Sequence, residues 1–64
     1  MSLRQLREAA GMSVAAVARY VGTSESLVRR WEAGSVTPGM GSAVKLARIL
    51  GVGLEDVARA CSVA

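Results

Sequence analysis

The fold of this chain depends on residues 14–38, which have the sequence VAAVARYVGTSESLVRRWEAGSVTP. Val14, Val17 and Val21 fall at helical spacing, and the run ends at Gly22, a residue type that adopts the left-handed conformation just past a helix end. Ser24 can then cap a second helix, because its hydroxyl accepts hydrogen bonds from free backbone N–H groups. The stretch therefore predicts a helix, a tight turn and a second helix.

The second of these helices, from Ser24 to Ala33, has an apolar side and a polar side. Leu27, Val28 and Trp31 form one apolar stripe. At about 100° per residue, four polar side chains lie opposite the stripe or on its flanks: Glu25, Ser26, Arg29 and Arg30. A helix that carries two arginines on its open side is suited to the major groove of DNA.

The segments around the turn extend this pattern over most of the chain. LRQLREAAGMS (3–13) precedes it, while WEAGSVTP (31–38) and KLARILGVGLEDV (45–57) continue and follow it in order. Together with Ala18, Gly22 and Val28 at the turn, these segments resemble the helix-turn-helix of Cro and the phage repressors, also called the xenobiotic-response-element type. The resemblance covers residues 3–58. It implies an all-α, compact five-helix lambda-repressor-like domain with the helix-turn-helix at helices 2 and 3.

Three further helices are expected outside the turn. Ser2 can cap a first helix that runs to about Ala10, and residues 40–50 and 54–61 predict a fourth and a fifth helix. The residues expected to face inward in the first and fourth helices are Leu3, Leu6, Ala10, Met40, Ala43, Leu46, Ala47 and Leu50. No linker or repeat interrupts the chain, so residues 1–64 are expected to form one domain, with residues 62–64 fraying at the end.

Two features of this pattern concern its structural core. The ring of Trp31 could stack on single-stranded bases, but its place beside Leu27 and Val28 favours the core. Arg7 and Glu32 could both be solvated charges. The resemblance instead implies a structural salt bridge between them, joining the first helix to the third.

The resemblance also implies particular DNA contacts. Base contacts are expected at the first two and the sixth positions of the third helix, and helical geometry adds one more, giving Glu25, Ser26, Arg29 and Arg30. Glu25 has a second interpretation, because an acidic residue there also stabilises the helix dipole. Contacts to the DNA backbone are expected from Ser13, Thr23 and Thr37. Two departures weaken DNA binding: Val14 stands where the family commonly has glutamine, and the loop 35–38 lacks the family's basic residues.

The sequence therefore predicts a small, repressor-like transcriptional regulator that binds double-stranded DNA sequence-specifically. The net charge of +3 favours nucleic acid only weakly. The alternative is a protein-interaction module with the same fold, such as an antitoxin-like partner or a docking domain, which Val14, Ala15 and Ala16 favour. Because 64 residues enclose a small core, a homodimer, at least on DNA, is expected, formed around Val52, Leu54 and Val57.

Several other classes of site and protein are not expected. The chain has one cysteine, Cys61, and no histidine, so neither a disulfide within the chain nor a zinc cluster nor a catalytic relay can be assembled. No metal, cofactor or small-molecule ligand is indicated, and an enzyme is the least favoured class. The chain also lacks the apolar runs of a membrane span or a signal peptide, so a cytoplasmic setting is expected.

Overall fold

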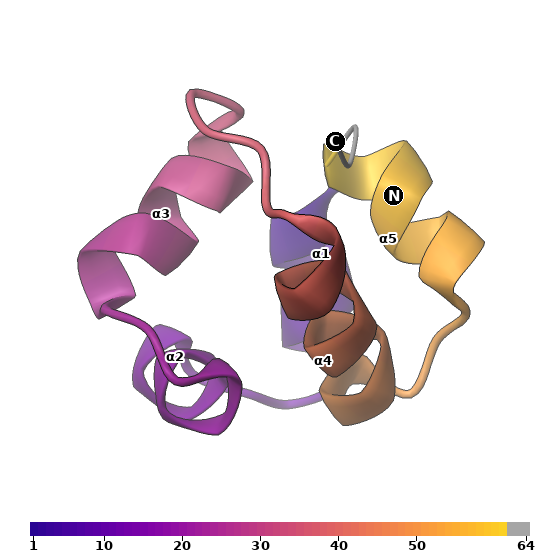
Figure 1. The fold of residues 1–64 in the computed structure, drawn as a ribbon. Helices are drawn as coiled ribbons and strands as arrows, with labels where there is room; N and C mark the ends of the chain where they lie inside the picture. Colours follow the sequence, from indigo (N-terminus) through magenta and orange to yellow (C-terminus); the bar gives the residue numbers. More distant parts are fainter. Residues whose placement is uncertain (62–64) are drawn as a thin grey trace.

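Five α-helices follow one another along the chain in the computed structural model, which describes residues 1–61 (Figure 1). They are α1 (Leu3–Ala9), α2 (Val14–Val21), α3 (Glu25–Ala33), α4 (Met40–Leu50) and α5 (Leu54–Cys61). No strand occurs in this part of the chain, so the expected all-α class is confirmed. The fraying expected of residues 62–64 lies outside the described residues.

Serine side chains begin the first three helices. The hydroxyl oxygens of Ser2, Ser13 and Ser24 each accept a hydrogen bond from a first-turn backbone N–H, at 3.2, 3.0 and 3.1 Å. At α1 the Gln5 side chain also accepts from the backbone N–H of Ser2 at 2.9 Å, which completes a capping box. The cap of α4 is Gly39, which has no side chain to take this role. Local sequence therefore fixes where α1, α2 and α3 begin.

The helices enclose one apolar core, with α4 between the α2–α3 pair and α5 (Figure 1). Val17, Val28, Leu46 and Val57 are almost completely buried and come from four different helices. Trp31 is 4% exposed and belongs to this core, so the structural interpretation of its ring is confirmed. α3 is thus held on one side by the interior of the domain.

The turn between α2 and α3 is formed by backbone hydrogen bonds. Gly22 has a φ of 84°, in the left-handed region that glycine adopts without strain. The N–H groups of Gly22 and Thr23 both donate to the carbonyl oxygen of Ala18, each at 2.9 Å. Lys45 from α4 donates to the carbonyl oxygen of Val21 at 3.4 Å, where the helix dipole is negative. These contacts set the start of α3 relative to α2.

Three expectations about burial were wrong. Ala10 is exposed because it caps α1 after the last helical residue, where the chain already turns away. Met40 is 55% exposed because it is the first residue of α4, and Pro38 is buried in its place. Val57 was expected at a dimer interface, but its exposed fraction is 0% because it packs into the core of its own chain.

Candidate nucleic-acid interface

The open side of α3 carries the four residues that the sequence analysis assigned to bases. Val28 and Trp31 are buried, Leu27 is half-buried, and Gly34 ends the helix in a left-handed conformation. The exposed residues are Glu25, Ser26, Arg29 and Arg30. α3 therefore presents one continuous polar surface whose position is fixed by the core behind it.

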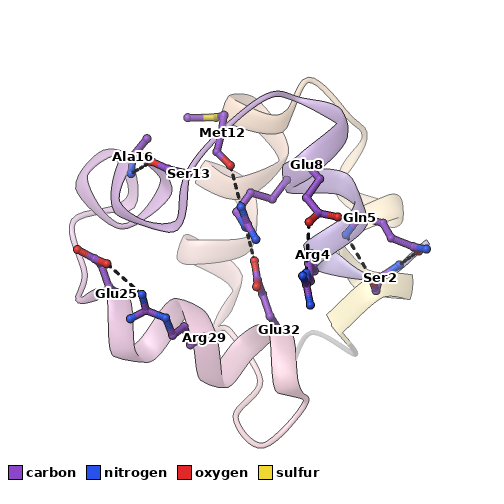
Figure 2. A network of polar contacts seen from close by, with 11 residues as sticks. Ser2, Arg4, Gln5, Glu8, Met12, Ser13, Ala16, Glu25, Arg29 and Glu32 are labelled. Atoms are coloured by element: carbon purple, nitrogen blue, oxygen red, sulfur yellow. Dashed lines mark hydrogen bonds and ion pairs between the residues drawn. The ribbon is translucent and has the colours of Figure 1, made fainter.

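Glu25 and Arg29 form an ion pair on this surface (Figure 2). A terminal nitrogen of Arg29 donates to Glu25 Oε1 at 3.3 Å, and the two side chains are 63% and 50% exposed, respectively. The i,i+4 spacing places them one helical turn apart, on the same side of α3. Glu25 also lies in the first turn of the helix, where the dipole favours negative charge. The carboxylate thus has two stabilising partners within its own helix.

Arg30 differs from Arg29 in its surroundings. Its side chain is exposed, and within residues 1–61 no carboxylate lies at ion-pair distance from it. A guanidinium carries five N–H donors in a planar fork that matches the O6 and N7 acceptors of guanine. Arg30 therefore has its full set of donors available on the surface of α3.

The three residues assigned to the DNA backbone lie at helix ends around α3. Ser13 is the exposed cap of α2, and its hydroxyl hydrogen remains available because the oxygen is the acceptor in the cap. Thr23 is half-buried in the turn before α3, while Thr37 is exposed in the segment between α3 and α4. The structure distributes these residues over three connections instead of gathering them in one place.

Arg7 in α1 and Glu32 in α3 form an ion pair that connects the two helices. Arg7 Nε donates to Glu32 Oε2, and a terminal nitrogen of Arg7 donates to the carbonyl oxygen of Met12 at 2.8 Å. The hydrogen bond to Glu32 raises the pKa of Arg7, while partial burial acts in the opposite direction. The exposed fractions of the two side chains are only 14% and 11%, so the pair is shielded from solvent at the inner edge of α3.

An open concavity of about 400 Å³ lies where α1, the first residue of α2 and the C-terminal half of α3 meet. Its lining residues are Arg4, Arg7, Val14, Arg29, Glu32 and Ala33. Arg4, which was not predicted as a site residue, forms an ion pair with Glu8 at 3.3 Å. The i,i+4 spacing of that pair was visible in the sequence, but only the arrangement of α1 against α3 brings Arg4 near Arg29.

The geometry is accompanied by a match to a known family. The family model described as Helix-turn-helix matches residues 3–57, which is most of the chain. The chain belongs to the Cro and phage-repressor type of helix-turn-helix family. As a phage-repressor-type domain, it is a DNA-binding helix-turn-helix of the regulatory kind.

Other comparisons add nothing to this phage-repressor-type assignment. No curated protein and no solved structure was found to match the chain.

Among the described residues, no three His, Cys, Asp or Glu side chains form a group that could hold a metal ion. In residues 1–61, none of the helices has the length and apolar character needed to cross a membrane.

Proposed function

We propose that this helix-turn-helix protein is a small, repressor-like transcriptional regulator that binds double-stranded DNA sequence-specifically, with α3 in the major groove. One observation carries the proposal: α3 buries Val28 and Trp31 and presents a polar surface that includes Arg30, whose donors are available. The major groove of B-DNA admits an α-helix and displays a distinct donor and acceptor pattern for each base pair.

The exposed residues of α3 have different roles in this proposal. Arg30 donates to guanine O6 and N7, while Ser26 forms a shorter-range hydrogen bond to a neighbouring base edge. Glu25 accepts from the N4 amine of cytosine. Arg29 completes the surface, and its partner is either a base or a phosphate. Backbone contacts from Ser13, Thr23 and Thr37 fix the position of α3 without reading sequence.

We also propose that the protein acts as a homodimer on DNA and that residues 1–64 form a single domain. A two-fold dimer reads two half-sites about one helical turn apart, which roughly doubles the number of contacts. The surface around Val52 and Leu54 supports this arrangement, because Leu54 remains 37% exposed and Val52 is half-buried. Both residues precede or begin α5, away from the polar surface of α3.

A selection from random duplexes tests the proposal, followed by titration of the selected duplex and a scrambled duplex of the same composition. We expect an enriched motif and an affinity for it at least about 10³-fold above that for the scrambled duplex. Equal affinity for the two duplexes would remove sequence-specific regulation from consideration.

The second candidate function is a protein-interaction module with the same fold. Two exposed apolar side chains favour it, namely Val36 in the connection between α3 and α4, at 37%, and Met40 at the start of α4, at 55%. The segment from Ser35 to Gly39, which includes Val36 and precedes Met40, contains no charged residue. Failure of the selection to enrich any duplex at low salt, where phosphate contacts are strongest, would favour this function.

A further inference from the structure

The concavity between α1 and α3 brings two arginines of α1 together with one arginine of α3. Arg4 and Arg7 come from α1 and Arg29 from α3, and in Figure 2 Arg4 and Arg29 lie on either side of Glu32. We propose that this concavity is a seat for one phosphate group of the DNA backbone, bound by Arg4 and Arg29 together. The inference rests on the proposed function, and it assigns Arg29 to a phosphate instead of a base.

Arg4 and Arg29 each have N–H donors that their ion pairs do not use. Arg4 uses Nε in its contact with Glu8 at 3.3 Å, and Arg29 uses one terminal nitrogen in its contact with Glu25 at 3.3 Å. Each guanidinium has five N–H groups, so most of its donors are not engaged in these contacts. Neither Glu8 nor Glu25 lines the concavity. The glutamates therefore orient the arginines from outside and leave the concavity to an incoming acceptor.

The buried part of this phosphate site is formed by the Arg7–Glu32 pair, which leaves room for a ligand. Arg7 is committed to Glu32 and to the carbonyl oxygen of Met12, and the Arg7 and Glu32 side chains are mostly buried. This pair has little net charge and holds α1 at a constant distance from α3. The other lining residues, Val14 and Ala33, are short and apolar. A phosphate can therefore approach from the open side, between Arg4 and Arg29.

The charges around the seat indicate which source of phosphate it takes. Each of the three arginines has a carboxylate partner, so long-range attraction for a free anion is weak. Bidentate donors are effective at short range, when a phosphate is already held in place. A phosphodiester positioned by the rest of the duplex meets this condition, whereas inorganic phosphate in solution does not. The seat therefore serves the backbone of bound DNA.

The test compares the parent with the double variant Arg4→Gln, Arg29→Gln, using the full chain, the selected duplex and a scrambled duplex over a range of salt concentrations. Glutamine keeps a similar stem and removes the charge and the fork. Arg59→Gln is the matched control, because Arg59 also forms an exposed ion pair, with Asp56 at 3.5 Å, and does not line the concavity. Circular dichroism checks that each variant is folded.

We expect the double variant to weaken binding to both duplexes by the same factor and to preserve their ratio. The slope of log K against log salt should decrease in magnitude by about one, because both arginines hold a single phosphate. Arg59→Gln should keep the parent slope. A duplex with one methylphosphonate at the contacted position should bind the parent more weakly than the unmodified duplex, but should bind the double variant no more weakly.

Four results would overturn the proposal. A double variant with the parent slope would show that the concavity holds no phosphate, and a slope change of about two would show two separate contacts. Saturable binding of inorganic phosphate to the parent, lost in the double variant, would make a free anion the ligand. A parent protein that binds no duplex would overturn the proposed function as well, whereas the other three results would not.

Discussion

Arg7 in α1 and Glu32 in α3 are 25 positions apart in the chain, yet their side chains form an ion pair with exposed fractions of 14% and 11%. Arg7 also donates to the carbonyl oxygen of Met12. One side chain of α1 therefore contacts both the connection between α1 and α2 and the helix α3. The core holds one side of α3 and this pair holds another. The orientation of the polar surface of α3 therefore depends on both.

Removing one partner of this pair should destabilise the domain more than replacing both. Glu32→Ala leaves a shielded guanidinium without its carboxylate, and we expect a loss of about 1 to 3 kcal/mol in the free energy of unfolding, the cost of a shielded donor without an acceptor. The double variant Arg7→Leu, Glu32→Leu should lose less, because no charge is left unpaired. Urea titrations measure both values. Arg4→Ala, which breaks an exposed pair, is the control and should change stability by about 0 to 1 kcal/mol.

Trp31→Ala should unfold the domain or nearly so. Trp31 is 4% exposed and contributes the largest side chain of the core, so its truncation should cost about 3 to 5 kcal/mol. That amount approaches the total stability expected of a small domain. Thermal melting followed by circular dichroism is the measurement, with Tyr20→Ala as control, because Tyr20 is 57% exposed. An unchanged melting temperature for Trp31→Ala would contradict the packing described for α3.

Arg30→Ala should relax sequence preference while leaving the fold intact. Loss of a bidentate contact to guanine removes about 1 to 3 kcal/mol of discrimination, so the affinity for the selected duplex should approach that for a scrambled one. Titration of both duplexes at one salt concentration measures the change. Arg48→Ala removes an exposed cation from α4 and should preserve the preference. If Arg30→Ala kept the parent preference, base reading would lie elsewhere.

Leu54→Glu should weaken self-association. Leu54 is 37% exposed at the start of α5, so a charge there can be hydrated in the monomer but would be desolvated in a dimer. Sedimentation of the parent and the variant, each with the selected duplex, measures the effect. Tyr20→Glu is the control, because Tyr20 is 57% exposed at the end of α2 and has no assigned contact with DNA. A parent that stays monomeric on its selected duplex would exclude the dimer.

Cys61 should react slowly with iodoacetamide in the folded protein. Burial raises the pKa of the Cys61 thiol, and the negative charge of Glu32 adds to the increase. Since the native thiol holds its proton more tightly than the unfolded one, stability should fall as the pH rises above the unfolded thiol pKa. Comparison with Cys61→Ser isolates this part of the pH dependence. Equal pH profiles of alkylation for folded and urea-unfolded protein would contradict the shift.

The boundaries of α2 and α3 could be predicted from the sequence because their signals are local. Ser13 and Ser24 begin the helices through hydrogen bonds to nearby N–H groups, and Gly22 and Gly34 end them in left-handed conformations. The apolar stripe of α3 is also a local pattern. The expected burial of Ala10 and Met40 failed at helix ends, because periodicity does not show where neighbouring helices stop covering a helix.

The remaining features depend on how helices are placed relative to one another. The concavity between Arg4 and Arg29 exists because α1 packs near α3. The family resemblance implied that Arg7 and Glu32 join these helices, but no spacing along the chain indicates that Arg4 and Arg29 line one concavity. The wrong expectation for Val57 also arose because helix placement cannot be predicted from local sequence. Its pattern identifies an apolar residue on α5, but the pattern cannot distinguish a core of the same chain from an interface with a second copy.

The two aromatic residues of the chain occupy contrasting environments. Trp31 is the only tryptophan and is buried behind the polar surface of α3, while Tyr20 is the only tyrosine and is mostly exposed at the end of α2. Indole fluorescence therefore reports on the interior of the domain, and phenol fluorescence reports on its surface. With no other chromophore of either kind present, unfolding can be followed from inside the molecule without an added label.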